Sequence, residues 1–400
     1  MRGIFVLNLK FNRSIYMDWK SLFISFIFLF TIPILSEGAY YEIHYFNFIL
    51  NKTFLSIVML VLFLASIISL TAKSLSQAPL FLFFLGFSMV TFNLLASLIV
   101  QNTNFMVTGL ILMLAPLFYS LSAIQIKAIV TSILIVLILL AGLRLLDAVL
   151  NISVNPITEI RLTYISELGT DVIRLQNNSL FGQKNALGSI LSMTLLLFLS
   201  LETLGYFKTQ RVLFCFITTF SFILLMSSTS AGGIIVGLFG IFFWMYYKTR
   251  YAFILSPLLL LSVIFLILSS GFDEMLSYKL GSASSKIDLF PPFFLAILES
   301  PSLLIFGYGP VGNPMSFYTE STFLDMILNF GVFLPFVLMA FLLTMVVKTV
   351  FSRQLFLSLA YGSTIFLLLT QNSSFLIPNI ICFLILGNIQ KMEKQSLVPG

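Results

Sequence analysis

The chain has 400 residues, of which 59% are apolar and only 9% are charged, and its formal net charge is +6. Soluble globular domains are about 45–50% apolar and about 25% charged. So few charges, together with 45 phenylalanines, cannot cover a water-facing surface of this size. The composition argues against a cytosolic enzyme, a nucleic-acid-binding module and a disulfide-stabilised secreted domain. It predicts an all-α polytopic membrane protein.

Twelve apolar runs follow one another along the chain. A helix that spans a bilayer needs about 20 mostly apolar residues. The runs cover residues 20–36, 54–71, 79–100, 105–121, 128–146, 186–204, 212–226, 231–247, 252–269, 322–343, 355–370 and 374–389. We therefore expect about 12 transmembrane helices in a single integral membrane domain over residues 1–400.

The basic residues predict which ends of these helices face the cytoplasm, because short cytoplasmic loops carry most of the Lys and Arg. With the N-terminus inside, the cytoplasmic segments collect 14 of the 21 basic residues, namely Arg2, Lys10, Arg13, Lys20, Lys73, Lys127, Lys208, Arg211, Lys248, Arg250, Lys348, Arg353, Lys391 and Lys394. Short outer loops such as 101–104 and 227–233 contain none. Both termini are therefore expected in the cytoplasm, and the first apolar run is expected to remain as an uncleaved helix.

Two long hydrophilic loops, 147–184 and 270–321, fall on the outer side. These loops and the adjoining helix ends hold six of the seven remaining basic residues, namely Arg144, Arg161, Arg174, Lys184, Lys279 and Lys286. Long loops cross a membrane regardless of their charge, so an ordinary solvated loop is one interpretation. The other is a functional site on the outer face, because the chain places its few charges there.

The first loop contains a predicted short helix over 156–168, with Arg161 on its apolar face. Arg161 either extends to the lipid interface or points into an amphipathic cleft. Arg174 precedes an amide-rich segment that leads into a spanning helix. Asn185 can cap that helix, and free backbone N–H groups beside Lys184 would favour an anion. Ordinary capping is the alternative interpretation.

The second loop contains a short apolar segment, 292–300, that is expected to lie in the membrane interface. Gly307, Gly309 and Gly312 then satisfy the spacing G-x-G-x-x-G. A dinucleotide site is rejected because no strand–turn–helix context surrounds them and Pro310 blocks a helix. We expect these glycines to form a tight backbone turn.

Two carboxylates stand at the start of the tenth apolar run. Glu320 is either an N-terminal cap, favoured by the helix dipole, or a base that accepts a proton from a hydroxyl. Asp325 follows about one and a half turns later. His44 is the only histidine and the two cysteines lie in separate apolar runs, so no metal cluster or cofactor is expected.

These features are similar to those of the O-antigen polymerase/O-antigen ligase superfamily, and most closely to the Wzy-type polymerases. Three local patterns match: Arg174 followed by 180–186, the glycine turn at 305–312, and the helix start at 320–331. The chain departs from the family at three points. Ligases usually have a histidine where Glu320 stands, the Ser-Arg pair of a short outer turn is absent from 228–233, and Lys286 occupies a position often taken by arginine.

The resemblance implies metal-independent glycosyl transfer at the periplasmic face of the bacterial inner membrane. Undecaprenyl-diphosphate-linked oligosaccharides would be polymerised into O-antigen or capsule, beside a possible chain-length regulator and membrane lipid. Arg174 and Glu320 would be catalytic. The leaving diphosphate would be bound by Arg161, Lys286 and Lys184, because cations form strong charge-assisted hydrogen bonds with phosphate. Supporting or acceptor-binding roles would fall to Asn185, Asp325 and Tyr308.

Two alternatives remain at this stage. An O-antigen ligase, which moves finished glycan to lipid A-core, would use the same fold and cations, and only the missing histidine argues against it. A lipid-linked oligosaccharide flippase or other transporter is disfavoured because transporters carry ionisable residues within their spans. The predicted spans of this chain have almost none, and those present lie near span ends.

Overall fold

The computed structural model describes residues 77–97, 106–150, 184–207, 210–227, 230–248, 297–307, 321–352, 354–371 and 377–397, with single positions at 64, 66, 67 and 295. Within these residues every regular element is a helix, and no strand occurs. The expectation of an all-α fold is confirmed for this part of the chain.

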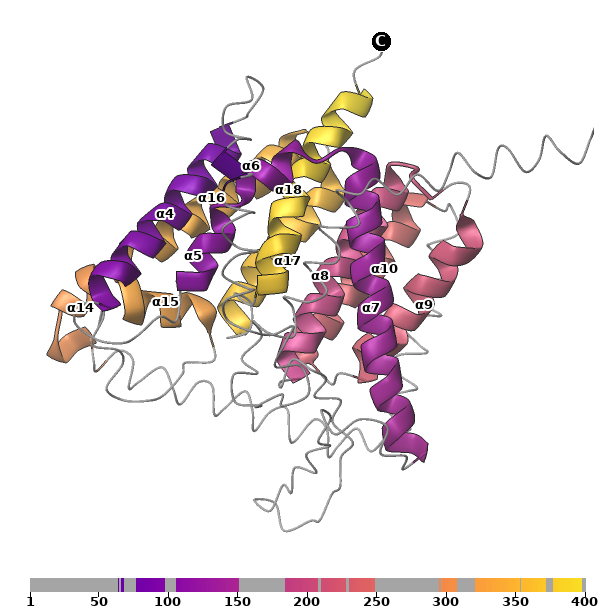
Figure 1. Cartoon of the computed structure of the whole chain (residues 1–400), viewed down its shortest axis with the longest axis horizontal. Helices are drawn as coiled ribbons and strands as arrows, with labels where there is room; N and C mark the ends of the chain where they lie inside the picture. The colour runs from indigo at the N-terminus through magenta and orange to yellow at the C-terminus, as the bar shows by residue number, and fades with distance from the viewer. Residues whose placement is uncertain are drawn as a thin grey trace, which may run out of the picture.

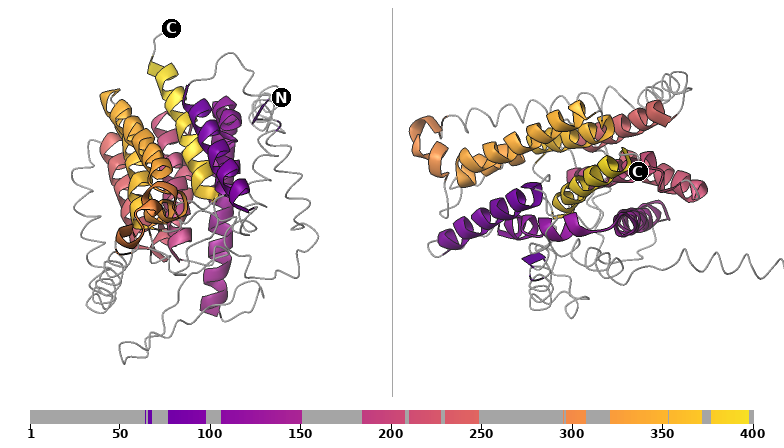
Figure 2. Two further views of the ribbon diagram at one scale, coloured as in Figure 1. Left: turned by 90° about the vertical axis from the view of Figure 1, so that its left-hand side faces the viewer. Right: turned by 90° about the horizontal axis from the view of Figure 1, so that it is seen from above.

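The helices form a bundle with α8 and α18 at its centre (Figure 1). They are α4 (Gln77–Ser97), α5 (Met106–Leu112), α6 (Ala115–Ser120), α7 (Ala123–Leu150), α8 (Lys184–Thr203), α9 (Arg211–Ser227), α10 (Ala231–Lys248), α14 (Ser302–Phe306), α15 (Thr322–Phe330), α16 (Phe333–Phe351), α17 (Leu355–Thr370) and α18 (Ile377–Leu397). Figure 2 shows α18 between a layer containing α4 to α7 and a layer containing α15 to α17. Helix α8 contacts α7, α9, α10, α17 and α18.

Helix α8 is central because its sequence carries no charge from Leu187 to Ser200 and every residue in that stretch is buried. A helix that is apolar all round belongs inside a protein or a membrane bundle. Three of its buried hydroxyl groups are satisfied within the helix: Ser192 Oγ donates to the Ser189 carbonyl at 3.0 Å, Thr194 Oγ1 to the Ile190 carbonyl at 2.7 Å and Ser200 Oγ to the Leu196 carbonyl at 2.7 Å. The fourth, Ser189 Oγ, accepts from the Asn379 amide of α18. Burial of these small polar residues therefore leaves no unpaired hydroxyl.

Helix α18 is buried from Asn379 to Gln390, although three amide side chains lie in that stretch. The Asn388 amide donates hydrogen bonds of 2.8 Å to the carbonyls of Phe118 and Leu121 at the end of α6. The Phe118 carbonyl also accepts the Leu121 N–H at 3.3 Å, whereas the last carbonyls of a helix generally lack a partner within it. Asn388 therefore fixes α18 against α6 while satisfying these groups.

Glycines bring two helix pairs into close contact. Gly233 of α10 faces the backbone of Gly188 in α8, and Gly86 of α4 faces the backbone of Gly109 in α5. A β-carbon at either α10 or α4 position would overlap the opposite backbone. Small residues at helix interfaces let backbones approach closely, which is the usual packing device of helices within a bilayer.

Several predicted runs coincide with helices, but two do not form a single helix. The run 105–121 is broken at Met113–Leu114 into α5 and α6, and the run 322–343 is broken at Gly331 into α15 and α16. Gly331 has a φ of 75°, and a side chain there would overlap the carbonyl of Ile305. The expectation of one span over 322–343 is therefore wrong, because α14 packs into this break. The runs 20–36 and 252–269, and most of 54–71, lie outside the described residues.

Helix α16 is the one helix among the described residues that is long and apolar enough to cross a membrane by itself. Shorter apolar stretches of 10–17 residues occur in α4, α5–α6, α7, α8, α9, α10, α17 and α18. The expected 12 membrane spans are therefore not confirmed by the described part of the chain. Large apolar side chains are nevertheless exposed on several helices, such as Phe84 (62% exposed), Val212 (85%) and Phe333 (75%).

The glycine contact between α8 and α10 predicts opposite effects for two identical substitutions. Gly233→Ala places a methyl group against the Gly188 backbone and is expected to lower the free energy of unfolding by about 1–3 kcal/mol. Gly362→Ala, in α17, meets nothing within 4 Å and is expected to stabilise the protein by about 0.5–1 kcal/mol. Thermal unfolding of the purified protein in detergent tests this difference. Equal melting temperatures for the two variants would contradict the close contact.

Candidate functional site

A buried polar cluster lies where the ends of five helices meet. Its members come from α8, the turn before α10, the start of α15, the end of α17 and the start of α18, and they are Ser189, Ser230, Ser321, Thr322, Gln371 and Asn379. All six side chains are buried. We call this set the polar cluster.

Gln371 makes the central contacts of the polar cluster. Its backbone carbonyl accepts two hydrogen bonds from Thr322, one from the N–H at 3.1 Å and one from Oγ1 at 2.5 Å. Its side-chain amide nitrogen donates to Ser230 Oγ at 3.2 Å. One residue therefore joins the end of α17 to the starts of α15 and α10.

The start of α15 is further held by Ser321, which is the N-terminal cap of this helix. Ser321 Oγ accepts from the Leu324 N–H and donates to the Leu368 carbonyl, both at 3.5 Å. Asp325 lies in the first turn and is only 8% exposed. A carboxylate in the first turn of a helix is stabilised by the unpaired N–H groups and the dipole.

Helix α8 is attached to the same cluster through two contacts. The Asn379 amide nitrogen donates to Ser189 Oγ at 3.0 Å, and Gly188 meets Gly233 of α10. The first turn of α8 contains Lys184 and follows the loop that carries Arg174. The polar cluster therefore brings together the helix starts that follow both long loops.

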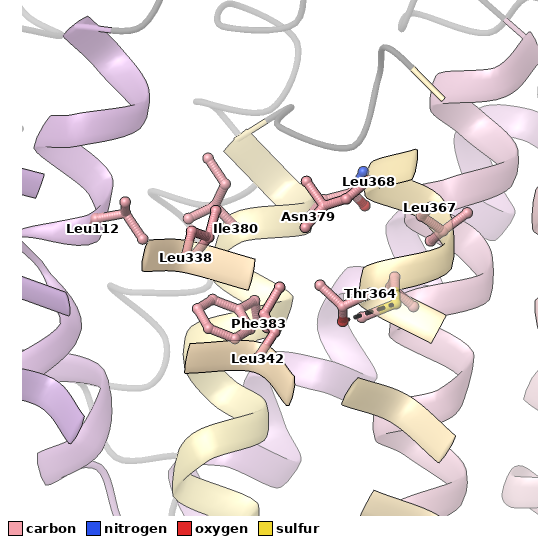
Figure 3. Close-up of a pocket in the computed structure, with 10 residues that line it drawn as sticks. Leu112, Leu338, Leu342, Thr364, Leu367, Leu368, Asn379, Ile380 and Phe383 are labelled. Atoms are coloured by element: carbon pink, nitrogen blue, oxygen red, sulfur yellow. Dashed lines mark hydrogen bonds between the residues drawn. The ribbon is translucent and has the colours of Figure 1, made fainter. Parts of the chain in front are cut away.

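A small pocket of about 30 Å³ lies beside the polar cluster (Figure 3). Ten side chains from α5, α8, α16, α17 and α18 line it, and nearly all of them are apolar. Thr364 Oγ1 donates to the Ala360 carbonyl at 3.0 Å and lies 4.0 Å from Met193 Sδ. The volume suffices for about one or two water molecules, so this pocket cannot hold a sugar.

A larger groove of about 400 Å³ opens on the side of the bundle between α4 and the α15–α16 pair. Its walls are Phe81, Phe84, Leu85, Ser88, Ile305, Phe330, Phe333, Leu334 and Val337. We call it the lateral groove. Its size falls in the range of about 300–1,000 Å³ typical of small-ligand sites. Its apolar walls are suited to a hydrocarbon chain.

None of the described residues in the apolar segment before α14 lines this groove. Ile297 instead packs against Ile327 and Leu328 on α15. Gly307 ends α14 with a φ of 62°, and its N–H donates to the Leu303 carbonyl at 2.8 Å. A side chain at Gly307 would overlap the Asn329 backbone. Gly309 and Gly312 lie outside the described residues, so the expected tight turn stays a prediction.

The end of the bundle opposite the polar cluster carries Lys127. Its ammonium group donates to the Tyr206 carbonyl at 2.7 Å and lies 4.6 Å from the centre of the Phe207 ring. Burial lowers the pKa of Lys127, and the Glu202 carboxylate acts in the opposite direction. This residue stands one position before the predicted span 128–146 and attaches the start of α7 to the α8–α9 turn.

The structure describes only some of the expected site residues. Lys184 and Asn185 lie in the first turn of α8, so Asn185 is inside the helix and is not its cap, while Asp325 is buried in α15. The other five expected residues, Arg161, Arg174, Lys286, Tyr308 and Glu320, lie outside the described residues. Among the described residues no three or more His, Cys, Asp or Glu side chains gather where they could hold a metal ion.

Sequence inspection did not identify Ser230, Gln371 and Asn379 as site residues. Ser230 immediately precedes the run 231–247, Gln371 immediately follows the run 355–370, and Asn379 lies near the start of the run 374–389. Gln371 begins a short outer loop that contains no charged residue. An amide or hydroxyl at the end of an otherwise apolar helix was the available signal. Which of these residues meet depends on the packing of helices that are far apart in sequence.

Comparisons with models of protein families, with curated proteins and with solved structures found no match to this chain.

Proposed function

We propose that this chain is a multi-pass membrane glycosyltransferase that polymerises undecaprenyl-diphosphate-linked repeat units into O-antigen or capsule. The observation that carries the proposal is the polar cluster, because it gathers the helix starts that follow the two charged loops. Catalysis of glycosyl transfer needs cations at the leaving diphosphate and a base at the acceptor hydroxyl. Arg174 precedes one of these helix starts, and Glu320 immediately precedes the other.

The proposed orientation has about 12 spans, cytoplasmic termini and periplasmic loops at 147–184 and 270–321. Exposed phenylalanines on α4 and α16 support a lipid environment, since soluble monomers rarely expose large apolar patches. The separation of Lys127 from the polar cluster supports two chemically different membrane faces. The chain would then lie in the bacterial inner membrane with its active face in the periplasm.

The proposed reaction breaks the bond between the anomeric carbon of the growing glycan and its diphosphate carrier. An acceptor hydroxyl on another carrier-linked repeat forms the new glycosidic bond and gives its proton to Glu320. Negative charge grows on the leaving diphosphate, and Arg174, with Arg161, Lys286 and Lys184, would stabilise it. Each charge-assisted hydrogen bond of this kind contributes about 1.5–3 kcal/mol. Asn185, Asp325 and Tyr308 would support the acceptor, and the proposed reaction uses neither metal nor cofactor.

The lateral groove suits the lipid part of this substrate. Its walls come from α4, α14, α15 and α16, so its occupant would lie next to the helix that begins just after Glu320. A lipid chain gains little from leaving a bilayer that is as apolar as the groove. We therefore expect the groove to recognise the shape and packing of the chain rather than its hydrophobicity.

The first test is deletion of the gene in the native host, with surface polysaccharide resolved by gel. We expect a ladder of chain lengths to collapse to core plus one repeat, and we expect the intact gene to restore the ladder. Arg174→Ala is expected to fail in this complementation, whereas Arg211→Ala, at an exposed position in α9, is expected to succeed at equal protein level. Loss of even the single repeat would instead indicate a ligase or a flippase. Carrier-linked polymer outside the membrane would identify the ligase.

The role of Glu320 is tested by replacing it with glutamine. Glu320→Gln removes the proton acceptor while retaining size, so we expect polymer formation to fall about 100-fold or more. Glu299→Gln, at an exposed position before α14, is the matched control and is expected to polymerise normally. Quantified polymer in membranes supplied with lipid-linked repeats gives the readout. Equal activity of the two variants would exclude Glu320 as the base.

The proposed orientation is tested with cysteines introduced one at a time into a background that carries Cys215→Ala and keeps the buried Cys382. Ser300→Cys lies in the second long loop and Ser352→Cys in the α16–α17 turn, and both positions are exposed. A membrane-impermeant maleimide applied to spheroplasts is expected to label Ser300→Cys and to leave Ser352→Cys unlabelled until the membrane is permeabilised. Labelling of both in intact spheroplasts would contradict the orientation.

A further inference from the structure

We propose that Gln371 is a positioning residue that sets the place of the acidic start of α15 relative to the entry of α8. The inference rests on the proposed function, because it assigns to Gln371 the placement of Thr322, two residues after Glu320, relative to the first turns of α8, which follow Arg174 in the sequence. It is independent of the family patterns, since the end of α17 belongs to none of the three matching segments. It follows from the contacts of the polar cluster.

The first step concerns the backbone of Gln371. Helix α17 ends at Thr370, and Gln371 adopts an extended conformation with φ −140° and ψ 138°. Its N–H closes the helix by donating to the Leu367 carbonyl at 2.9 Å, while its own carbonyl leaves the helix direction and accepts from Thr322. Because both donor groups of Thr322 bind this one carbonyl, the first residue of α15 is held by Gln371. Glu320 is separated from Thr322 by a single residue.

The second step concerns the side chain. The Gln371 amide reaches across to Ser230, immediately before α10, at 3.2 Å. Gly232 leaves the space for it, since a β-carbon at this position would overlap the amide nitrogen. The side chain is only 3% exposed. The amide therefore fixes the end of α17, and with it Thr322, against the start of α10.

The third step carries the alignment to α8. Gly233 follows Gly232 directly in the sequence. It packs on the Gly188 backbone, where no side chain intervenes. Two backbones in direct contact transmit a displacement with little loss, because neither has a flexible side chain between them. The path from Thr322 through Gln371 and Ser230 thus ends at the first turns of α8. The loop that enters α8 contains Arg174.

Gln371 acts through other residues and not on the substrate. Its burial keeps it from a sugar or a phosphate, and its carbonyl and amide are already engaged by Thr322 and Ser230. A misplacement of about 1 Å of a catalytic group can reduce the rate about 100-fold. Loss of the amide should therefore lower kcat while KM for the lipid-linked donor stays nearly constant.

The test compares Gln371→Met, Ser230→Ala and the double variant with Gln354→Met as the matched control. Gln354 begins the other end of α17, its side chain is 1% exposed, and neither amide atom has a hydrogen-bond partner within the described part of the protein. Gln354→Met therefore removes a buried amide without breaking a side-chain hydrogen bond. Purified proteins in proteoliposomes receive lipid-linked repeat units extracted from the host that lacks the gene. Initial rates then give kcat and KM.

We expect Gln371→Met to lower kcat about 10- to 100-fold with little change in KM. The double variant should be no slower than Gln371→Met alone, because the two single changes break the same hydrogen bond. Gln354→Met should keep wild-type kcat. If Gln371→Met does not reach wild-type yield, Ser230→Ala and Gly232→Ala break the same contact from the α10 side and carry the test.

Normal kcat in Gln371→Met, or in both α10 variants, overturns the positioning role. Additive losses in the double variant overturn it as well, because they show that the two residues act separately. An equal loss in Gln354→Met would show that any buried amide in α17 matters and would also overturn it. An inactive wild-type protein refutes the proposed function itself, and this outcome is distinct from an active wild type with an unaffected Gln371→Met.

Discussion

Most of the described structure depends on the burial of helix α8. The stretch of α8 from Leu187 to Ser200 carries no charge, and most of its hydroxyls donate to carbonyls of the same helix, so this stretch can be surrounded on every side. Five other helices contact it, and Gly188 lets α10 approach to backbone contact. Once α10 is held at this distance, the turn that precedes it is placed near the end of α17. The polar cluster is a consequence of that packing.

The two ends of the bundle have different chemistry. One end gathers hydroxyls and amides whose hydrogen bonds cross between helices, as between Gln371 and Ser230. At the other end, Lys127 binds a carbonyl and an aromatic ring. The lateral groove lies between α4 and the α15–α16 pair, next to the break at Gly331. This break turns α15 into a short separate helix, so that its polar start lies in the polar cluster while its end, at Phe330, reaches the groove. A single continuous helix over 322–343 would not provide this arrangement.

The positions of most described helices follow from continuous apolar runs and from the polar residues that interrupt them, and the sequence predicts them to within a few residues. The breaks at Met113–Leu114 and Gly331 are missed by the count of apolar runs, although Pro116 stands in the first turn of α6 and Pro335 in the first turn of α16. Glycine and proline within an apolar run are common in membrane helices, so neither residue by itself marks a break. Gly331 interrupts its helix because α14 occupies the space that a continuous helix would need. Of the expected site residues, Asp325 was identified from its charge. Gln371 and Ser230 were missed, because an uncharged polar residue at the end of an apolar run has no distinctive pattern.

The sequence by itself determined that the described chain is helical and where most of its helices run, because hydrophobic runs and their polar ends are local properties. It also indicated which helix starts follow charged loops. Only the tertiary structure decided that α8 and α18 are central, that Gly331 separates two helices, and that Gln371 joins Thr322 to Ser230. The physical reason is that these features depend on contacts between residues far apart in the sequence, from 26 positions for Ile305 and Gly331 to 270 for Phe118 and Asn388. Composition and local patterns carry no information about such pairings.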